Sequence, residues 1–220
     1  MPIESLEAKE LFLKGIANAQ QGKIQQAIDD LTKALEIEED YEIYFLRGNV
    51  FGVNGDIDKA IEDYNSTIEL FNDHSEAIFL RGLSFIEKEL FEKAHNDFDR
   101  CIEIIPQFSR AYAEKAFIYS KQGKAEDALD YFTKAIELEK DNPIFLYNRS
   151  LVLNALERFN EAKNDLDEVI KIDENFIHAY RLRASIYEKL KNEDEFQRDM
   201  KKFFELKHEM ENRESVKSEK

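Results

Sequence analysis

The segment RGNVFGVNGDIDKAIEDYNSTI, residues 47–68, decides the fold, because the chain repeats its pattern at a nearly fixed interval. Five further segments align with it without a gap: KGIANAQQGKIQQAIDDLTKAL, RGLSFIEKELFEKAHNDFDRCI, KAFIYSKQGKAEDALDYFTKAI, RSLVLNALERFNEAKNDLDEVI and RASIYEKLKNEDEFQRDMKKFF. Their second residues are small and lie 33, 34, 34, 34 and 34 residues apart: Gly15, Gly48, Gly82, Ala116, Ser150 and Ala184. Self-similarity at this period indicates an array of supersecondary units that stack on one another.

Two more columns of small residues recur within each segment. The first holds Ala27, Ala60, Ala94, Ala128 and Ala162 and is broken by Phe196. The second lies seven residues later and holds Ala34, Thr67, Cys101, Ala135 and Val169, ending in Phe203. Seven residues make two helical turns, so both columns belong to one face of a helix. Small side chains on that face let the backbone of a neighbouring helix approach closely.

Large apolar residues fill the positions between the small ones and divide each repeat into two helices, A and B. Helix A carries a stripe four residues before and three residues after the first small column, as Tyr44 and Phe51 do around Gly48. Helix B carries one large residue between its two small columns: Leu31, Tyr64, Phe98, Phe132, Leu166 and Met200. Gly22, Gly55 and Gly123 lie at the turn from A to B, where a left-handed conformation ends a helix. Only Gly52 belongs to neither a small column nor a turn.

This pattern resembles the tetratricopeptide repeat family over roughly residues 5 to 206. The resemblance implies an all-α fold, a right-handed α-solenoid of about six antiparallel hairpins with a C-terminal helix extension. The departures are Asn18, which replaces an aromatic residue in the first repeat, and Phe196 and Phe203 in the last. Terminal repeats lack one neighbour, so atypical residues are expected there.

We expect one repeat domain over residues 1–206, with repeats at about 8–40, 41–74, 75–108, 109–142, 143–176 and 177–206. The segment 207–220 is highly charged and has no apolar stripe beyond Met210. It is predicted to be the charged end of the last helix or a disordered tail.

The composition narrows the classes of partner. The formal net charge is −16, from 47 acidic against 31 basic side chains, and such a field repels nucleic acid and anionic membranes. The single cysteine, Cys101, excludes an internal disulfide and a cysteine-based zinc site. With no signal-peptide pattern and no apolar stretch of membrane-spanning length, we expect a cytoplasmic protein.

The search for chemistry predicts no catalytic, cofactor or metal site. The four histidines lie in different repeats without metal-ligand spacing, and no phosphate-binding or nucleophile motif occurs. Adjacent acids such as Glu62 and Asp63 point to different sides of a helix, which argues against a general acid and base pair. Cys101 stands in a small-residue column and is interpreted as a buried substitute for alanine.

A basic residue precedes the first small column in every repeat: Lys14, Arg47, Arg81, Lys115, Arg149 and Arg183. An acid recurs in register on helix B, at Asp30, Asp63, Asp97, Asp165 and Asp199, with Tyr131 as the exception. Six cations in a row could form an anion-binding strip. Because an acid accompanies them, we favour structural ion pairing between repeats.

The family resemblance implies that partner peptides or helices bind in a groove lined by the A helices. Residues three before and one after the first small column lie on one face of helix A, and many are apolar. They either line the groove or complete the packing inside each hairpin, and the sequence leaves both open. The candidate groove residues are Phe45, Asn49, Phe79, Leu83, Arg110, Phe117, Lys121, Tyr147, Asn148 and Arg181.

Some family members hold the C-terminal carboxylate of chaperones with a clamp of Lys, Asn and Arg from consecutive repeats. Here Asn49 and Asn148 stand at compatible positions, but Phe45 and Glu114 stand where the cations would be. The clamp is therefore not expected, although Arg110 and Lys121 could hold an acidic group differently.

We expect a non-enzymatic scaffold that binds a protein or peptide ligand in its groove. The alternative is a structural module, such as a homodimer, in which the groove or an open end receives another copy or the chain's own C-terminal helix. Phe196, Phe203 and Phe204 motivate this alternative, because a terminal helix rich in aromatic residues needs a cover.

Overall fold

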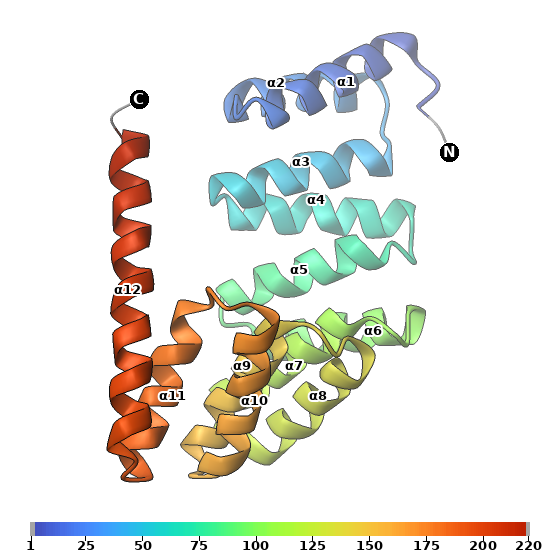
Figure 1. The fold of residues 1–220 in the computed structure, drawn as a ribbon. Helices are drawn as coiled ribbons and strands as arrows, with labels where there is room; N and C mark the ends of the chain where they lie inside the picture. The colour runs from blue at the N-terminus through green and yellow to red at the C-terminus, as the bar shows by residue number, and fades with distance from the viewer. Residues whose placement is uncertain (1–2, 219–220) are drawn as a thin grey trace. The chain divides into compact units, whose positions relative to one another are not determined.

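The computed structural model describes residues 3–218 and contains only helices within that range (Figure 1). The helices are α1 (Leu6–Gln20), α2 (Ile24–Ile37), α3 (Tyr41–Asn54), α4 (Ile57–Leu70), α5 (Ser75–Glu87), α6 (Phe91–Ile104), α7 (Ser109–Lys121), α8 (Ala125–Leu138), α9 (Pro143–Ala155), α10 (Phe159–Ile172), α11 (Ile177–Lys189) and α12 (Glu193–Ser218). Each odd-numbered helix packs most extensively against the even-numbered helix that follows it. The predicted all-α fold of paired A and B helices is confirmed.

The chain divides into two compact units, with one boundary in the sequence between them. Unit 1 is Met1–Gln107 and contains the hairpins α1/α2, α3/α4 and α5/α6. Unit 2 is Phe108–Lys220 and contains α7/α8, α9/α10 and α11/α12. Each compact unit is a stack of three hairpins, and the division after Gln107 lies next to the predicted boundary between the third and fourth repeats. Within each unit, every B helix packs on the A helix of the next hairpin.

Side-chain caps and turn residues fix the ends of the helices. Four A helices begin at a residue whose side chain accepts a hydrogen bond from the first turn: Ser5, Asp40, His74 and Asn142. The predicted left-handed glycines are confirmed, with φ of 71° at Gly22, 82° at Gly55 and 74° at Gly123. The other three turns place non-glycine residues in the same region: Glu89, Glu157 and Lys191, with φ of 57°, 59° and 56°. These three residues carry strain that glycine avoids.

The small columns lie at the contacts between helices, as predicted. The first column of helix B is fully buried from Ala27 to Ala162. A β-carbon added at Gly48 would lie 2.9 Å from Cε1 of Tyr64, and one at Gly82 would lie 2.7 Å from Cε1 of Phe98. Real β-carbons do not approach other atoms this closely, so these positions require glycine in the packing that the chain adopts.

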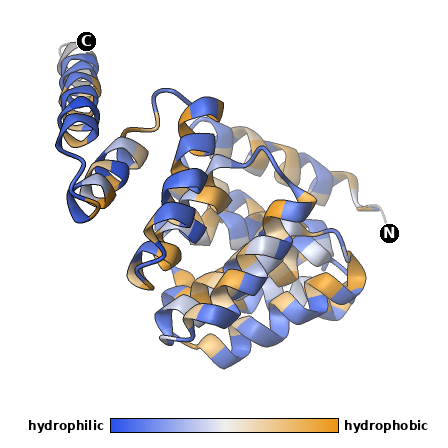
Figure 2. Ribbon diagram, turned by 60° about the horizontal axis from the view of Figure 1, so that its bottom comes forward, coloured by the Kyte–Doolittle hydropathy of each residue, from blue (hydrophilic) through white to orange (hydrophobic). Residues whose placement is uncertain are grey.

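Apolar cores run through both units. In unit 1 a buried cluster around Leu31, Ile43 and Val50 joins α1, α2 and α3. In unit 2 a larger cluster extends from α7 to α11 and includes Phe132, Phe145 and Leu166. Apolar and polar residues alternate along the helical ribbons, as expected for helices that bury one face (Figure 2).

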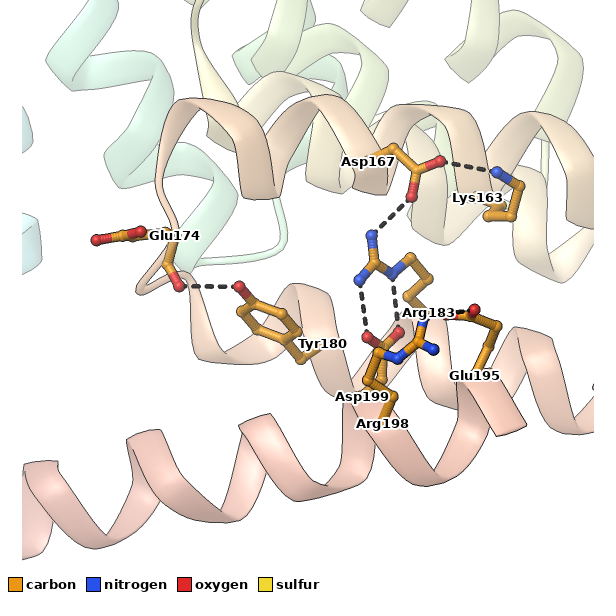
Figure 3. Close-up of polar contacts among 8 residues, drawn as sticks. All are labelled: Lys163, Asp167, Glu174, Tyr180, Arg183, Glu195, Arg198 and Asp199. Atoms are coloured by element: carbon orange, nitrogen blue, oxygen red, sulfur yellow. Dashed lines mark hydrogen bonds and ion pairs between the residues drawn. The ribbon is translucent and has the colours of Figure 1, made fainter. Parts of the chain in front are cut away.

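The recurring arginines each connect three helices. Nε and Nη2 of Arg47 donate to the carboxylate of Asp63 in its own hairpin over 2.8 and 2.7 Å, and Nη1 donates to Thr32 in the preceding hairpin. Figure 3 shows the equivalent arrangement at Arg183, which joins Asp199 to Asp167. Arg81 and Arg149 repeat it, with Asn65 and Thr133 as the third partners. The ion pairs between the recurring arginines and the predicted acids thus lie within a hairpin, which corrects the prediction that they join neighbouring repeats. The link between neighbouring repeats is the third bond of each arginine.

Two repeats use lysine at the same position. Lys14 pairs with Asp30 over 3.1 Å, and Asn18 donates to the other carboxylate oxygen of Asp30 over 2.7 Å. Asn18, the departure in the first repeat, therefore takes over a donor role that arginine fulfils elsewhere. Lys115 is buried, and its Nζ lies 4.7 Å from the ring centroid of Tyr131, which replaces the acid.

The last helix continues past the repeat region, in agreement with the predicted C-terminal helix extension. The repeat region was predicted to end at residue 206, and α12 runs to Ser218. Leu206 is buried, while Phe204 and Met210 are exposed. The charged segment is thus the end of a helix through residue 218, and residues 219–220 lie outside the described part. No helix in the described part combines the length and apolarity needed to cross a membrane.

Candidate functional site

The A helices of unit 1 form an open hollow with an apolar lining. It lies between α3 and α5 and has a volume of about 340 Å³. We call it the unit 1 hollow, and its lining residues are Asn49, Gly52, Val53, Ile57, Tyr64, Leu80, Leu83, Ser84 and Glu87. Two of the predicted groove residues, Asn49 and Leu83, thus lie in one site.

Gly52, which has no side chain, leaves open space at the unit 1 hollow. A β-carbon at Gly52 would meet only the hydroxyl oxygen of Tyr64, at 3.6 Å, so the space beside it is open. Val53, the next residue, is 79% exposed. Gly52 is the glycine that neither the small columns nor the turns explained. It was the one sequence signal that could have located this hollow.

Asn49 has a fixed orientation at the hollow. The hydroxyl of Tyr64 donates a hydrogen bond to Oδ1 of Asn49 over 3.0 Å. Burial raises the pKa of Tyr64, so the hydroxyl keeps its proton at neutral pH and remains a donor. With Oδ1 accepting from Tyr64, the Asn49 side chain offers its amide hydrogens to a ligand.

Phe45 and Phe79 occupy equivalent positions in consecutive repeats but have different surroundings. Phe45 is half-buried, with its ring centroid 4.6 Å from that of His74 and 6.3 Å from that of Tyr64. Phe79 is only 3% exposed, and its ring packs 5.6 Å from that of Phe98. The expectation that Phe79 lines a groove is therefore corrected, because its side chain belongs to the core of the α5/α6 hairpin.

An aromatic cluster around His74 lies beside Phe45 and was not foreseen. Tyr41 and Phe71 pack edge-on against the His74 ring at 5.9 and 5.6 Å. Nδ1 of His74 accepts a hydrogen bond from the backbone N–H of Ala77 over 3.1 Å and so caps α5. Burial lowers the pKa of His74.

Unit 2 has a second hollow on its A helices, between α9 and α11. We call it the unit 2 hollow, and its lining residues are Tyr147, His178, Arg181, Leu182 and Ser185. Its volume is about 290 Å³. Tyr147 packs against Phe176 at 5.1 Å between ring centroids and lies 6.4 Å from His178. The predicted residues Tyr147 and Arg181 thus share one site. Ser185 stands one residue after the first small column, on the face considered for the groove, whereas the sequence did not point to His178.

The remaining predicted groove residues lie on α7 and α9, outside the two hollows. Nζ of Lys121 lies 5.2 Å from the ring centroid of Phe117, and the guanidinium carbon of Arg110 lies 5.0 Å from that of Phe108. Asn148 is half-buried on α9 and is not a lining residue of the unit 2 hollow. These residues lie on A helices of unit 2 and do not converge on one point.

Side chains that commonly bind metal ions are not clustered in the described part. No group of three or more His, Cys, Asp or Glu side chains within it is placed to hold an ion. Cys101 is buried, and its Sγ lies 3.4 Å from the carbonyl oxygen of Ser75. This burial agrees with its interpretation as a core residue.

Models of the tetratricopeptide repeat match residues 8–41, 41–74, 109–142 and 144–176. The chain is 33% identical over 90 residues to the DnaJ homolog subfamily C member 7 homolog of Schizosaccharomyces pombe, covering 39% of this chain and 19% of that protein. It is 33% identical over 96 residues to heat shock protein STI1 of Saccharomyces cerevisiae, covering 40% and 16%. The chain therefore spans about a fifth or less of the length of these curated relatives.

Solved structures share the fold over more of the chain. The protein PilF of Pseudomonas aeruginosa superimposes with a TM-score of 0.77 at 18% identity, covering 97% of this chain and 98% of that one. A repeat protein of Parabacteroides merdae gives 0.72 at 25% identity, covering 93% and 80%. YrrB, described as having an unusual peptide-binding site, gives 0.63 at 19% identity, covering 80% and 91%.

Proposed function

This chain belongs to the tetratricopeptide repeat family, and we propose that it binds an apolar segment of a partner protein in the unit 1 hollow. The family fold supports a protein-interaction scaffold in general. The observation that carries the finer proposal is the space beside Gly52, where an inner helix lacks a side chain in the middle of an apolar lining. A large apolar side chain of the partner would occupy this space.

The lining favours a protein ligand over a polar small molecule. Leu80 and Leu83 on α5 face Gly52 and Val53 on α3 across an open surface. An apolar groove with one fixed polar group is typical of sites that accept a helix or an extended peptide. Asn49, oriented by Tyr64, would donate to a backbone carbonyl of the ligand and so set its register.

The charge of unit 1 favours a basic partner segment. Residues 1–107 hold 23 acidic against 10 basic side chains, a formal charge of −13, whereas residues 108–220 hold 24 against 21, a formal charge of −3. Complementary potentials steer association and select partners. We therefore expect Lys or Arg to flank the apolar anchor.

Relatives that carry chaperone names do not extend this proposal to chaperone tails. The cations of a carboxylate clamp are missing, since Phe45 packs into an aromatic cluster and Glu114 is acidic. YrrB, a repeat protein of the same fold described as having an unusual peptide-binding site, supports peptide recognition by such a fold.

The test is a selection of peptides from a random display library on the immobilised full-length chain. Dissociation constants of the selected peptides are then measured by fluorescence anisotropy on three proteins: the wild type, Gly52→Leu and Asn96→Leu. Gly52→Leu fills the unit 1 hollow, and peptides anchored there should bind at least about tenfold more weakly. Asn96→Leu adds a leucine at an exposed position of α6 outside the hollow and should leave affinity unchanged. Equal affinity of all three proteins for every selected peptide would refute the proposal.

A further inference from the structure

Arg181 differs from most other arginines of this chain in having no acidic partner. Carboxylates pair with Arg47, Arg81, Arg149, Arg158, Arg183, Arg198 and Arg213. Within the described part, the Arg181 guanidinium makes no hydrogen bond and no ion pair, although the chain carries 47 acids. An exposed guanidinium that stays unpaired in so acidic a protein is available to a ligand.

The unit 2 hollow places further polar side chains beside Arg181. Tyr147 of α9 and His178 of α11 line it together with Ser185 and Leu182, and no carboxylate belongs to the lining. An adjoining hollow, between α11 and α12, shares His178 and Arg181 and has Phe203 and Met210 as apolar lining residues. Its other cation, Lys207, pairs with its one acid, Glu211, so Arg181 is the cation left without a carboxylate there. His178 and Arg181 therefore lie at the boundary of two adjoining hollows.

A third hollow of unit 2, between α8 and α10, shows the opposite composition. Arg149 and Arg158 line it, and both are paired with acids of the same hollow, Asp165 and Glu161. Its cations are thus neutralised within the chain. A ligand anion would have to displace a carboxylate there, whereas at Arg181 it would displace only water.

We infer that the unit 2 hollow binds an acidic side chain of a partner peptide, with Arg181 as the principal contact and Tyr147 and His178 beside it. The planar guanidinium matches the two oxygens of a carboxylate or a phosphate. Leu182 and the stacked Tyr147 and Phe176 rings provide an apolar surface for the neighbouring residue of the peptide. The inference rests on the proposed function, since both require peptides on the inner helices, but it uses a different unit and the opposite charge.

The experiment uses the same display selection on the full-length chain, followed by C-terminally amidated synthetic peptides, so that only side chains supply negative charge. Affinities are compared for the wild type, Arg181→Gln, Arg181→Lys and the matched control Arg198→Gln, which removes an exposed arginine of α12 outside both hollows. One class of selected peptides should be enriched in Asp or Glu and bind Arg181→Gln about tenfold more weakly. Arg181→Lys should retain part of the affinity, and Arg198→Gln all of it. A peptide with phosphoserine in place of the acid tells whether phosphate serves as well as carboxylate.

The outcomes separate the two proposals. If selected peptides lose affinity for Gly52→Leu but none is acidic or sensitive to Arg181→Gln, the inference is overturned and the proposed function stands. If no peptide is selected, or if neither Gly52→Leu nor Arg181→Gln changes the affinity of any selected peptide, both the proposed function and the inference fail. Because Arg181 is exposed and unpaired, Arg181→Gln should melt with the wild type, so lost binding reports on the site and not on the fold.

Discussion

The hydroxyl of Tyr64 donates to Oδ1 of Asn49 over 3.0 Å, and this hydrogen bond connects the core of the α3/α4 hairpin to the lining of the unit 1 hollow. Tyr64→Phe removes the hydroxyl and keeps the ring that packs on Gly48. We expect the free energy of unfolding to fall by about 1 kcal/mol, which is the net contribution of one part-buried hydrogen bond. Peptides selected on the wild type should bind more weakly, because Asn49 is free to rotate. Chemical denaturation and anisotropy measure the two effects, and unchanged affinity would exclude a role for Asn49.

Gly48 and Gly52 lie one turn apart on α3 and should respond oppositely to alanine. Gly48→Ala drives a β-carbon into the Tyr64 ring and should destabilise the chain by about 1–3 kcal/mol. Gly52→Ala meets open space in a helix and should stabilise it by about 0.5–1 kcal/mol. Urea unfolding of both variants under one condition checks the pair. Equal shifts would mean that the packing around Tyr64 differs from this description.

The strained turns offer a gain in stability. Glu89 and Glu157 hold positive φ at positions where other repeats have glycine. Glu157→Gly should raise the free energy of unfolding by up to about 1 kcal/mol, because the left-handed conformation costs glycine nothing. Gly55→Ala, at φ 82°, provides the reverse control and should lower it. A lower melting temperature for Glu157→Gly would show that its side chain contributes more than its backbone costs.

The arginine bridges are predicted to be essential for stability. Arg183→Met leaves the buried carboxylate of Asp199 without its bidentate partner and should cost about 3 kcal/mol or more. Arg198→Met removes an exposed ion pair with Glu195 and should cost less than about 1 kcal/mol. Thermal and urea unfolding compare the two, and similar losses would contradict the difference in burial on which this prediction depends.

His74 should make stability depend on pH. Burial lowers the pKa of His74 in the folded chain below its usual value of about 6.5, and its unprotonated Nδ1 caps α5. The neutral ring therefore stabilises the fold above about pH 6.5, and this contribution is lost as pH falls through the lower folded-state pKa. His74→Asn keeps a capping acceptor and does not titrate. The difference in melting temperature between wild type and His74→Asn should change between about pH 7 and pH 5, and a constant difference would rule out the effect.

Much of the fold was predictable because it follows from local spacing. One residue type that recurs at one position of the repeat is enough to predict the buried alanines and the turn glycines, and its recurrence gives the 34-residue period. Arg47 and Asp63 were predictable as partners for the same reason. The third bond of Arg47 to Thr32 was not, since that acceptor changes from repeat to repeat.

The candidate site was less predictable, because exposure depends on the neighbours and not on the column alone. Phe45 and Phe79 share a column, yet one lies in an aromatic cluster at the surface and the other packs on Phe98 in the core. The hollow at Gly52 depends on how far α3 and α5 stand apart, which no single segment encodes. The segment after residue 206 was left open between a charged helix end and a disordered tail, because it has no apolar stripe to mark a helix.

Each bridging arginine makes hydrogen bonds in its own hairpin and to the preceding hairpin. When one of these hairpins opens, the hydrogen bond between the two hairpins is lost. Arg47 and Arg81 couple the three hairpins of unit 1 in this way, and Arg149 and Arg183 couple those of unit 2. Within either unit, a ligand that reduces the local opening of one hairpin therefore also reduces the opening of the next hairpin. Ligand binding at one A helix would thereby slow the hydrogen exchange of backbone amides in the neighbouring repeat, without moving the backbone.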